Sequence, residues 1–105
     1  MEIYGLKTCD TCRKAIKALP QARFVDVRAD GVPEDVMQAA HATFGAALVN
    51  TRSTTWRGLS AVEREAEPAQ LLADHPTLMK RPLIADGSTL YLGWTEDVQG
   101  ALGVA

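Results

Sequence analysis

The sequence predicts an α/β fold in which a mixed four-stranded sheet is flanked by helices, and three observations lead to this prediction. The chain begins with a strand, a helix and a second strand, an order that favours two parallel strands joined by a right-handed crossover. It ends with a hairpin and a helix, which add antiparallel strands to the sheet. The stretch between these parts is polar and partly helical, and we interpret it as a helical insertion. This order is typical of the thioredoxin-like class, and the 105 residues fit a single domain, residues 1–105.

The first half of the chain alternates strand and helix signals. A strand is expected over Glu2–Gly5, a helix over Asp10–Leu19 ended by Pro20, and a strand over Arg23–Val27. Pro33 suits the first position of the next helix, and Gly45 suits its C-terminal cap. Helical spacing gives the two helices apolar faces that we expect to be buried: Cys12, Ala15, Ile16 and Leu19 in the first, and Val36, Met37, Ala40 and Phe44 in the second.

The second half gives shorter elements, separated by proline and glycine. In order, these are a helix over Pro68–Asp74 stopped by Pro76, a segment over Met79–Ala85 that becomes a strand after Pro82, a hairpin turn at Asp86–Ser88, a strand over Thr89–Leu92, and a helix over Glu96–Leu102 capped by Thr95.

Composition and charge narrow the function classes. A net charge of −2 argues against a protein that binds nucleic acid directly. No apolar run is long enough to cross a bilayer, and the first residues carry no signal-peptide pattern. We therefore expect a cytoplasmic protein with no membrane partner, and a monomer. Eight of the eleven lysines and arginines gather in three segments, residues 7–17, 52–57 and 80–81. They would form an anion-binding pocket if the segments meet, or solvated faces if they do not.

Chemistry is indicated by Cys9 and Cys12, a C-x-x-C pair placed where the first strand leads into the first helix. The helix N-terminus carries about half a unit of positive charge, which stabilises a thiolate. We therefore expect the pKa of Cys9 to lie below the ordinary value of about 8.5, with Lys7 and Arg13 supporting it. Cys12, one turn into the helix, is placed to close a disulfide with Cys9, so the pair suits a nucleophile and a resolving thiol.

Two alternatives remain open for this pair. It could be half of a zinc site, although His41 and His75 are the only nitrogen donors left and neither has finger spacing. Alternatively, Cys12 is only a small buried residue of the helix face, and Cys9 alone carries the chemistry. We expect no bound metal and no bound cofactor.

Two further segments carry candidate residues. Arg81-Pro82 precedes the third predicted strand, and in a thioredoxin-like fold a cis proline here lies beside the active cysteine. Arg81 would then face Cys9, whereas the alternative is a solvated arginine. Arg52 stands in a polar run, Asn50–Ser53, which by pattern alone is a surface loop. Four other residues are assigned no role: Trp56, His41, Tyr91 and Trp94.

Taken together, these segments resemble the arsenate reductase-like family, which includes ArsC, the Spx regulators and the YffB proteins. The resemblance rests on Ile3–Ala15, Leu48–Leu59, Leu78–Ile84 and Leu92–Trp94, with the middle segment most similar to the YffB branch. It implies a thioredoxin-like core with a helical insertion. It also implies that Cys9 attacks the substrate, that Arg52 and Arg81 bind an oxyanion, and that glutathione and glutaredoxin complete the reduction.

The chain departs from the arsenate reductase pattern at two positions: a histidine of the family falls at Gly5 and a third arginine falls at Gly93. Because each charge-assisted contact is worth about 1.5–3 kcal/mol, we expect weak arsenate binding. We therefore predict an oxidoreductase, a glutathione-linked thiol–disulfide reductase using Cys9 and Cys12, with arsenate reduction as an alternative. A further alternative is a redox-switched regulator that, like Spx, binds the C-terminal domain of the RNA polymerase α subunit. Glutathione is the expected co-substrate.

Overall fold

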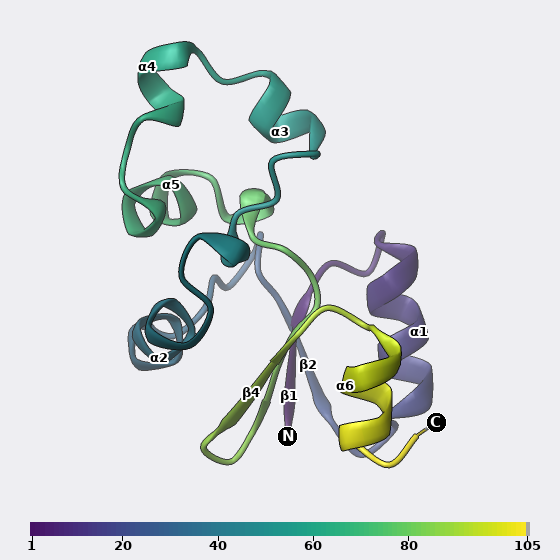
Figure 1. Cartoon of the computed structure of the whole chain (residues 1–105). Helices are drawn as coiled ribbons and strands as arrows, with labels where there is room; N and C mark the ends of the chain where they lie inside the picture. The colour runs from purple at the N-terminus through teal and green to yellow at the C-terminus, as the bar shows by residue number, and fades with distance from the viewer. Residues whose placement is uncertain (105) are drawn as a thin grey trace. The chain divides into compact units, whose positions relative to one another are not determined.

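The computed structural model describes residues 1–104 of the chain (Figure 1). These residues fall into two compact units, one formed by Met1–Val32 with the chain from Arg81 onward, and the other by Pro33–Lys80. The first unit contains the whole sheet and the cysteine pair, and the second contains the predicted helical insertion. A single domain over residues 1–105 stays a prediction.

The predicted mixed four-stranded sheet is confirmed, with the strand order β2-β1-β3-β4. β1 pairs in parallel with β2 and antiparallel with β3, which forms a hairpin with β4. The parallel pair needs a crossover connection, which the first helix supplies. The strands are β1 (Glu2–Gly5), β2 (Arg23–Asp26), β3 (Leu83–Asp86) and β4 (Thr89–Leu92).

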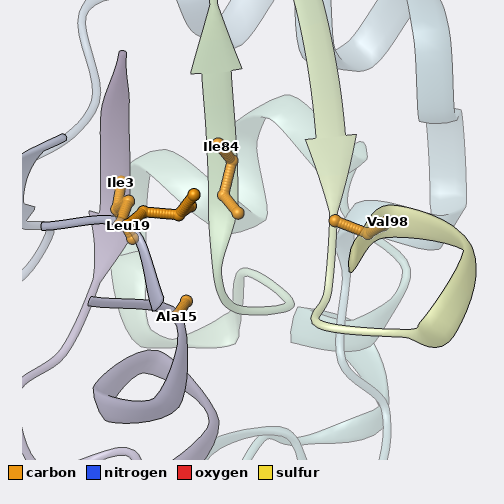
Figure 2. Close-up of a cluster of buried hydrophobic side chains, with 5 residues drawn as sticks. All are labelled: Ile3, Ala15, Leu19, Ile84 and Val98. Atoms are coloured by element: carbon orange, nitrogen blue, oxygen red, sulfur yellow. The ribbon is translucent and has the colours of Figure 1, made fainter. Parts of the chain in front are cut away.

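Two helices, α1 (Asp10–Ala18) and α6 (Glu96–Ala101), cover one face of this sheet (Figure 1). A cluster of buried side chains joins them to the two central strands, as Figure 2 shows. β1 and β3 each contribute one member, and the two members from the first helical segment are four residues apart, the spacing that places both on one face. The members of the cluster are Ile3, Ala15, Leu19, Ile84 and Val98.

Local signals fix the ends of several elements in this unit. Gly87 has φ +61° between the paired residues Asp86 and Thr89, which is the conformation that a two-residue hairpin loop requires. The Thr95 hydroxyl accepts a hydrogen bond from the Val98 N–H (3.2 Å) and so caps α6 as predicted.

The start of the third predicted strand is confirmed. A strand was predicted after Pro82, and β3 begins at Leu83, because Pro82 has no N–H to donate to a ladder. Met79 forms an isolated antiparallel bridge with Val49 in the second unit. Around that bridge, the Lys80 N–H donates to the Leu48 carbonyl (2.7 Å) and so joins the last residue of the unit to Leu48.

Apart from that bridge, the regular elements of the second unit are all helices among the residues described. The sequence predicted α5 with its observed bounds and one long helix, α2, in which Pro33 precedes the first residue rather than occupying it. Of the four apolar residues expected to be buried in α2, Ala40 is buried and the others are half-buried. The elements are α2 (Glu34–Phe44), η1 (Gly45–Leu48), α3 (Thr54–Arg57), α4 (Ala61–Arg64), α5 (Pro68–Asp74) and η2 (Pro76–Leu78).

Across residues 1–104, none of the helices is both long enough and apolar enough to pass through a membrane.

Candidate functional site: a cysteine pair at the start of a helix

Cys9 is the residue that leads from the first strand into α1. It has extended backbone angles (φ −87°, ψ 121°), is half-buried, and stands at the N-cap position of α1. Its own N–H donates to the Leu6 carbonyl (3.1 Å), and its carbonyl accepts from the Arg13 N–H (3.0 Å). The sulfur is therefore held at the open end of the helix, where amide N–H groups have no partners within the helix.

The surroundings of Cys9 favour its thiolate. Burial raises the pKa of Cys9, but hydrogen bonds from the Cys12 N–H, the Cys12 thiol, the Arg81 side chain and the Thr11 N–H lower it, and the net pKa lies below the ordinary value. Donors to a charged sulfur stabilise the charged form. Two of these donors are the helix amides that the sequence pattern predicted.

Cys12 has the opposite character. It is completely buried, with 0% of its surface exposed, and both cysteines are free thiols. Burial, helped by the neighbouring Cys9 sulfur, raises the pKa of Cys12 to about 11, against lowering by the Leu6 N–H and the Arg81 charge. At neutral pH, Cys12 is thus a neutral thiol that donates to Cys9, and the pKa values of the two sulfurs are shifted in opposite directions.

The loop before β3 brings Arg81 to the cysteines. The Arg81–Pro82 peptide bond is cis, the isomer that the sequence interpretation favoured. Pro82 is buried, and its carbonyl accepts a hydrogen bond from the Gly93 N–H (2.8 Å). Arg81 is half-buried and hydrogen-bonds Cys9, so its guanidinium supplies positive charge at the sulfur.

The two glycines at which the chain departs from the arsenate reductase pattern each have a structural reason. A Cβ on Gly5 would lie 2.5 Å from the Cys12 Sγ, far inside van der Waals contact. Gly93 has φ +82°, a backbone conformation that an arginine would adopt only with strain. Neither position accepts a cationic side chain without rearrangement.

The supporting residues predicted from sequence have partners of their own. Lys7 is exposed, with its Nζ 5.8 Å from the centroid of the Phe24 ring. Arg13 is exposed and forms a salt bridge with Asp10 one turn back on α1. Their support of the Cys9 thiolate stays a prediction.

Arg52 lies in the second compact unit, in an exposed turn. The Asn50 side-chain oxygen accepts from the Arg52 N–H (3.1 Å), and Ser53 then caps α3 by accepting from the Trp56 N–H (3.1 Å). This Asx turn explains why the polar run interrupts helix formation. A meeting of Arg52 with Cys9 stays a prediction.

Metal ligands do not gather elsewhere in the described part of the chain. No group of three or more histidine, cysteine, aspartate or glutamate side chains is placed to hold a metal ion there. His75 has a neighbour of another kind, the Glu63 carboxylate, at 3.9 Å from its Nε2.

Sequence reasoning missed two parts of the site. The Leu6 N–H donates to the Cys12 sulfur, and Gly5 leaves the space that this sulfur occupies. A signal for the second was present, since a glycine ending a buried strand often marks a close approach by another group. The sequence did not say which group approaches.

The fold and this site define a thioredoxin-like protein whose cysteine pair opens the first helix. The chain belongs to the ArsC family, whose model matches residues 4–102. An uncharacterized protein of Haemophilus influenzae is 37% identical over 103 residues, covering 90% of each chain. The global transcriptional regulator Spx of Bacillus subtilis is 30% identical over 106 residues, covering 90% of this chain and 80% of Spx. The solved YffB protein is similar over 99% of this chain and 98% of its own, with a TM-score of 0.85 and 27% identity.

Proposed function

We propose that this protein is a glutathione-linked thiol–disulfide reductase. The observation that carries the proposal is the unequal pair of sulfurs: Cys9 has a lowered pKa beside Arg81, and a neutral Cys12 donates to it. A half-exposed sulfur with a lowered pKa next to a protonated buried one is the arrangement that attack followed by resolution requires.

In the first step, the Cys9 thiolate attacks one sulfur of a disulfide substrate. A bond forms between Cys9 and that sulfur, the substrate S–S bond breaks, and the other half leaves as a thiolate that takes a proton from water. The negative charge thus moves from the attacking Cys9 sulfur to the leaving sulfur. Arg81 hydrogen-bonds the Cys9 sulfur and thereby favours the charged reactant.

In the second step, Cys12 loses its proton to water and attacks the Cys9 sulfur. The Cys9–Cys12 disulfide forms and the second substrate thiolate leaves, so two electrons have passed from the protein to the substrate. Conversion of Cys9 to a mixed disulfide removes the negative charge that helps to raise the Cys12 pKa, and that pKa should then fall below about 11. Two glutathione molecules would restore the dithiol and leave as glutathione disulfide.

The remaining predicted parts belong to the same proposal. Arg52 and Arg81 would hold a glutathione carboxylate or another anion. A cytoplasmic location would suit the chemistry, because glutathione keeps thiols reduced there. The protein would then act as a monomer with no bound cofactor.

Mass spectrometry of the intact protein tests the proposal directly. The reduced protein is incubated with glutathione disulfide at neutral pH and quenched in acid at intervals. The wild-type protein should pass through a transient glutathione adduct to an internal disulfide. The Cys12→Ala variant should accumulate one glutathione on Cys9, and Cys9→Ala should remain unmodified.

Two outcomes would contradict the proposal. One is a Cys12→Ala protein that takes up no glutathione at neutral pH. The other is wild-type protein in which the first adduct maps to Cys12.

Arsenate reduction is a second candidate, favoured by the ArsC family membership. We expect it to be weak, because Gly5 and Gly93 supply no cation and their positions resist one. An assay with arsenate, glutathione and glutaredoxin should give little turnover; robust turnover would make this the leading function.

A redox-switched regulator is the third candidate, favoured by the 30% identity to the transcriptional regulator Spx. Under this hypothesis the Cys9–Cys12 disulfide would change the affinity for the C-terminal domain of the RNA polymerase α subunit. A pull-down with reduced and with oxidised protein would discriminate, since the reductase proposal expects no complex in either state.

A further inference from the structure

Gly5 and Cys12 meet at the end of β1, and the space between them is smaller than any side chain. A Cβ built on Gly5 would lie 2.5 Å from the Cys12 Sγ and 3.4 Å from its Cβ. The backbone angles of Gly5 do not require a glycine, because Gly5 is absent from the glycines with positive φ. The position needs glycine for its lack of volume alone.

Neither backbone at this contact is free to move. The Gly5 carbonyl accepts from the Val27 N–H (3.0 Å), and Gly5 is in register with Asp26 of the parallel strand β2. Cys12 is fully buried on the inner face of α1, together with Ala15. The Phe24 ring, whose Cε1 lies 3.8 Å from the added Cβ, closes another side. A methyl group at position 5 would therefore displace the Cys12 sulfur rather than the chain.

The conformer that Gly5 permits is also the one that reaches Cys9. In this position the Cys12 thiol donates to the Cys9 sulfur and accepts from the Leu6 N–H. Only two staggered wells are common for such a side chain in a helix, and the second would move the sulfur by about 3 Å. A displaced sulfur would lose both contacts.

We propose that Gly5 is a positioning residue, whose missing side chain holds the Cys12 sulfur where it can resolve a mixed disulfide on Cys9. The inference rests on the proposed thiol–disulfide reductase function and deepens it. It gives Gly5 a role in the second step of the reductase. This role is separate from the effect on arsenate binding, where Gly5 simply supplies no cation.

The experiment compares Gly5→Ala with wild type in single-turnover resolution. Reduced protein is mixed with a chromogenic aromatic disulfide, and the two thiolates are released in sequence, the first by Cys9 and the second by Cys12. In Gly5→Ala the second release should slow by roughly tenfold to a hundredfold, because a misplacement of about 1 Å can cost about 10²-fold. The first release should change far less.

Two further variants keep the result interpretable. Gly100→Ala is the matched control, because its added Cβ meets open space within α6 and should leave both releases unchanged. In the Cys12→Ala background the clash is absent, so Gly5→Ala should leave the pH midpoint of Cys9 alkylation where Cys12→Ala alone puts it. With Cys12 present, Gly5→Ala should move that midpoint upward.

The outcomes separate this inference from the function. Unchanged second release in Gly5→Ala, with both releases present in wild type, would overturn the role of Gly5 and leave the reductase intact. Absence of any release in wild type would overturn the reductase. In that case the alkylation midpoints still test the Gly5–Cys12 contact, and an equal change of midpoint in both backgrounds would refute it.

Discussion

At the scale of single residues, the two cysteines divide the chemistry because their surroundings differ. Cys9 is half-buried and receives hydrogen bonds from Thr11, Cys12 and Arg81, which lower its pKa. Cys12 is fully buried and lies beside the charged sulfur, so its pKa rises to about 11. The sequence places both at a helix start, but only the contacts distinguish nucleophile from resolving thiol.

Arg81→Ala should raise the pKa of Cys9, because the variant removes a hydrogen bond to the thiolate. The rate of alkylation by iodoacetamide, measured against pH, should show its midpoint at higher pH than in wild type. The rate at pH 7 should fall severalfold, since the thiolate fraction below the midpoint falls about tenfold when the pKa rises by about one.

Arg28→Ala is a suitable control for this measurement, because Arg28 is an exposed arginine of the same compact unit. Its midpoint should match that of wild type. Equal midpoints in Arg81→Ala and wild type would show that the helix amides alone hold the Cys9 thiolate.

At the scale of elements, short helices depend on their caps. The helix α6 spans only Glu96–Ala101, and its Thr95 hydroxyl accepts from the Val98 N–H. Such a helix is too short to be stable alone, so the cap and the packing of Val98 into the sheet core must hold it. The same logic applies to α3 and α4, each four residues long and each capped by a serine.

Thr95→Ala should lower the free energy of unfolding by about 1 kcal/mol, because one N–H at the start of α6 loses its acceptor. Denaturation in urea, followed by circular dichroism, measures the change. Thr95→Ser retains the hydroxyl and should stay close to wild type. A Ser variant as unstable as the Ala variant would mean that the threonine methyl group, and not the cap, carries the effect.

At the scale of the whole molecule, the two thiols make the folding stability depend on pH with opposite signs. The Cys9 pKa is lowered on folding, so Cys9 contributes stability that is present above the unfolded value of about 8.5 and is lost as pH falls through the folded pKa. The Cys12 pKa is raised to about 11, so its contribution is present below about 8.5 and is lost as pH rises towards 11.

The reduced wild-type protein should therefore lose stability relative to Cys12→Ala as pH rises from about 8.5 to about 11, with a slope of up to about 1.4 kcal/mol per pH unit. Urea denaturation at a series of pH values, under reducing conditions, measures this slope. The loss of packing in Cys12→Ala lowers the free energy of unfolding by the same amount at every pH. It therefore shifts the curve of the variant against that of wild type without changing the difference between their slopes. Parallel curves over this range would show that the burial of Cys12 does not raise its pKa.

Much of the first compact unit could be predicted from sequence because its signals are local. The strand Glu2–Gly5, the hairpin at Gly87 and the cap Thr95 each follow from residues within one turn or one strand. The small helices of the second unit were harder, since four-residue segments such as Thr54–Arg57 carry too few residues to show a period. The start of β3 at Leu83 could also be predicted, because Pro82 has no N–H to donate to the ladder.

The sequence by itself determined the order of the elements, the mixed sheet and a cysteine pair at the mouth of a helix, because hydrophobic period and helix capping act over a few neighbouring residues. Tertiary structure decided the rest of the site. Arg81 contacts Cys9 only because a distant loop returns to the sheet, and Gly5 admits the Cys12 sulfur only because α1 packs on the strand that Gly5 ends. Contacts of this kind depend on close packing between segments far apart in the chain, which no local pattern encodes.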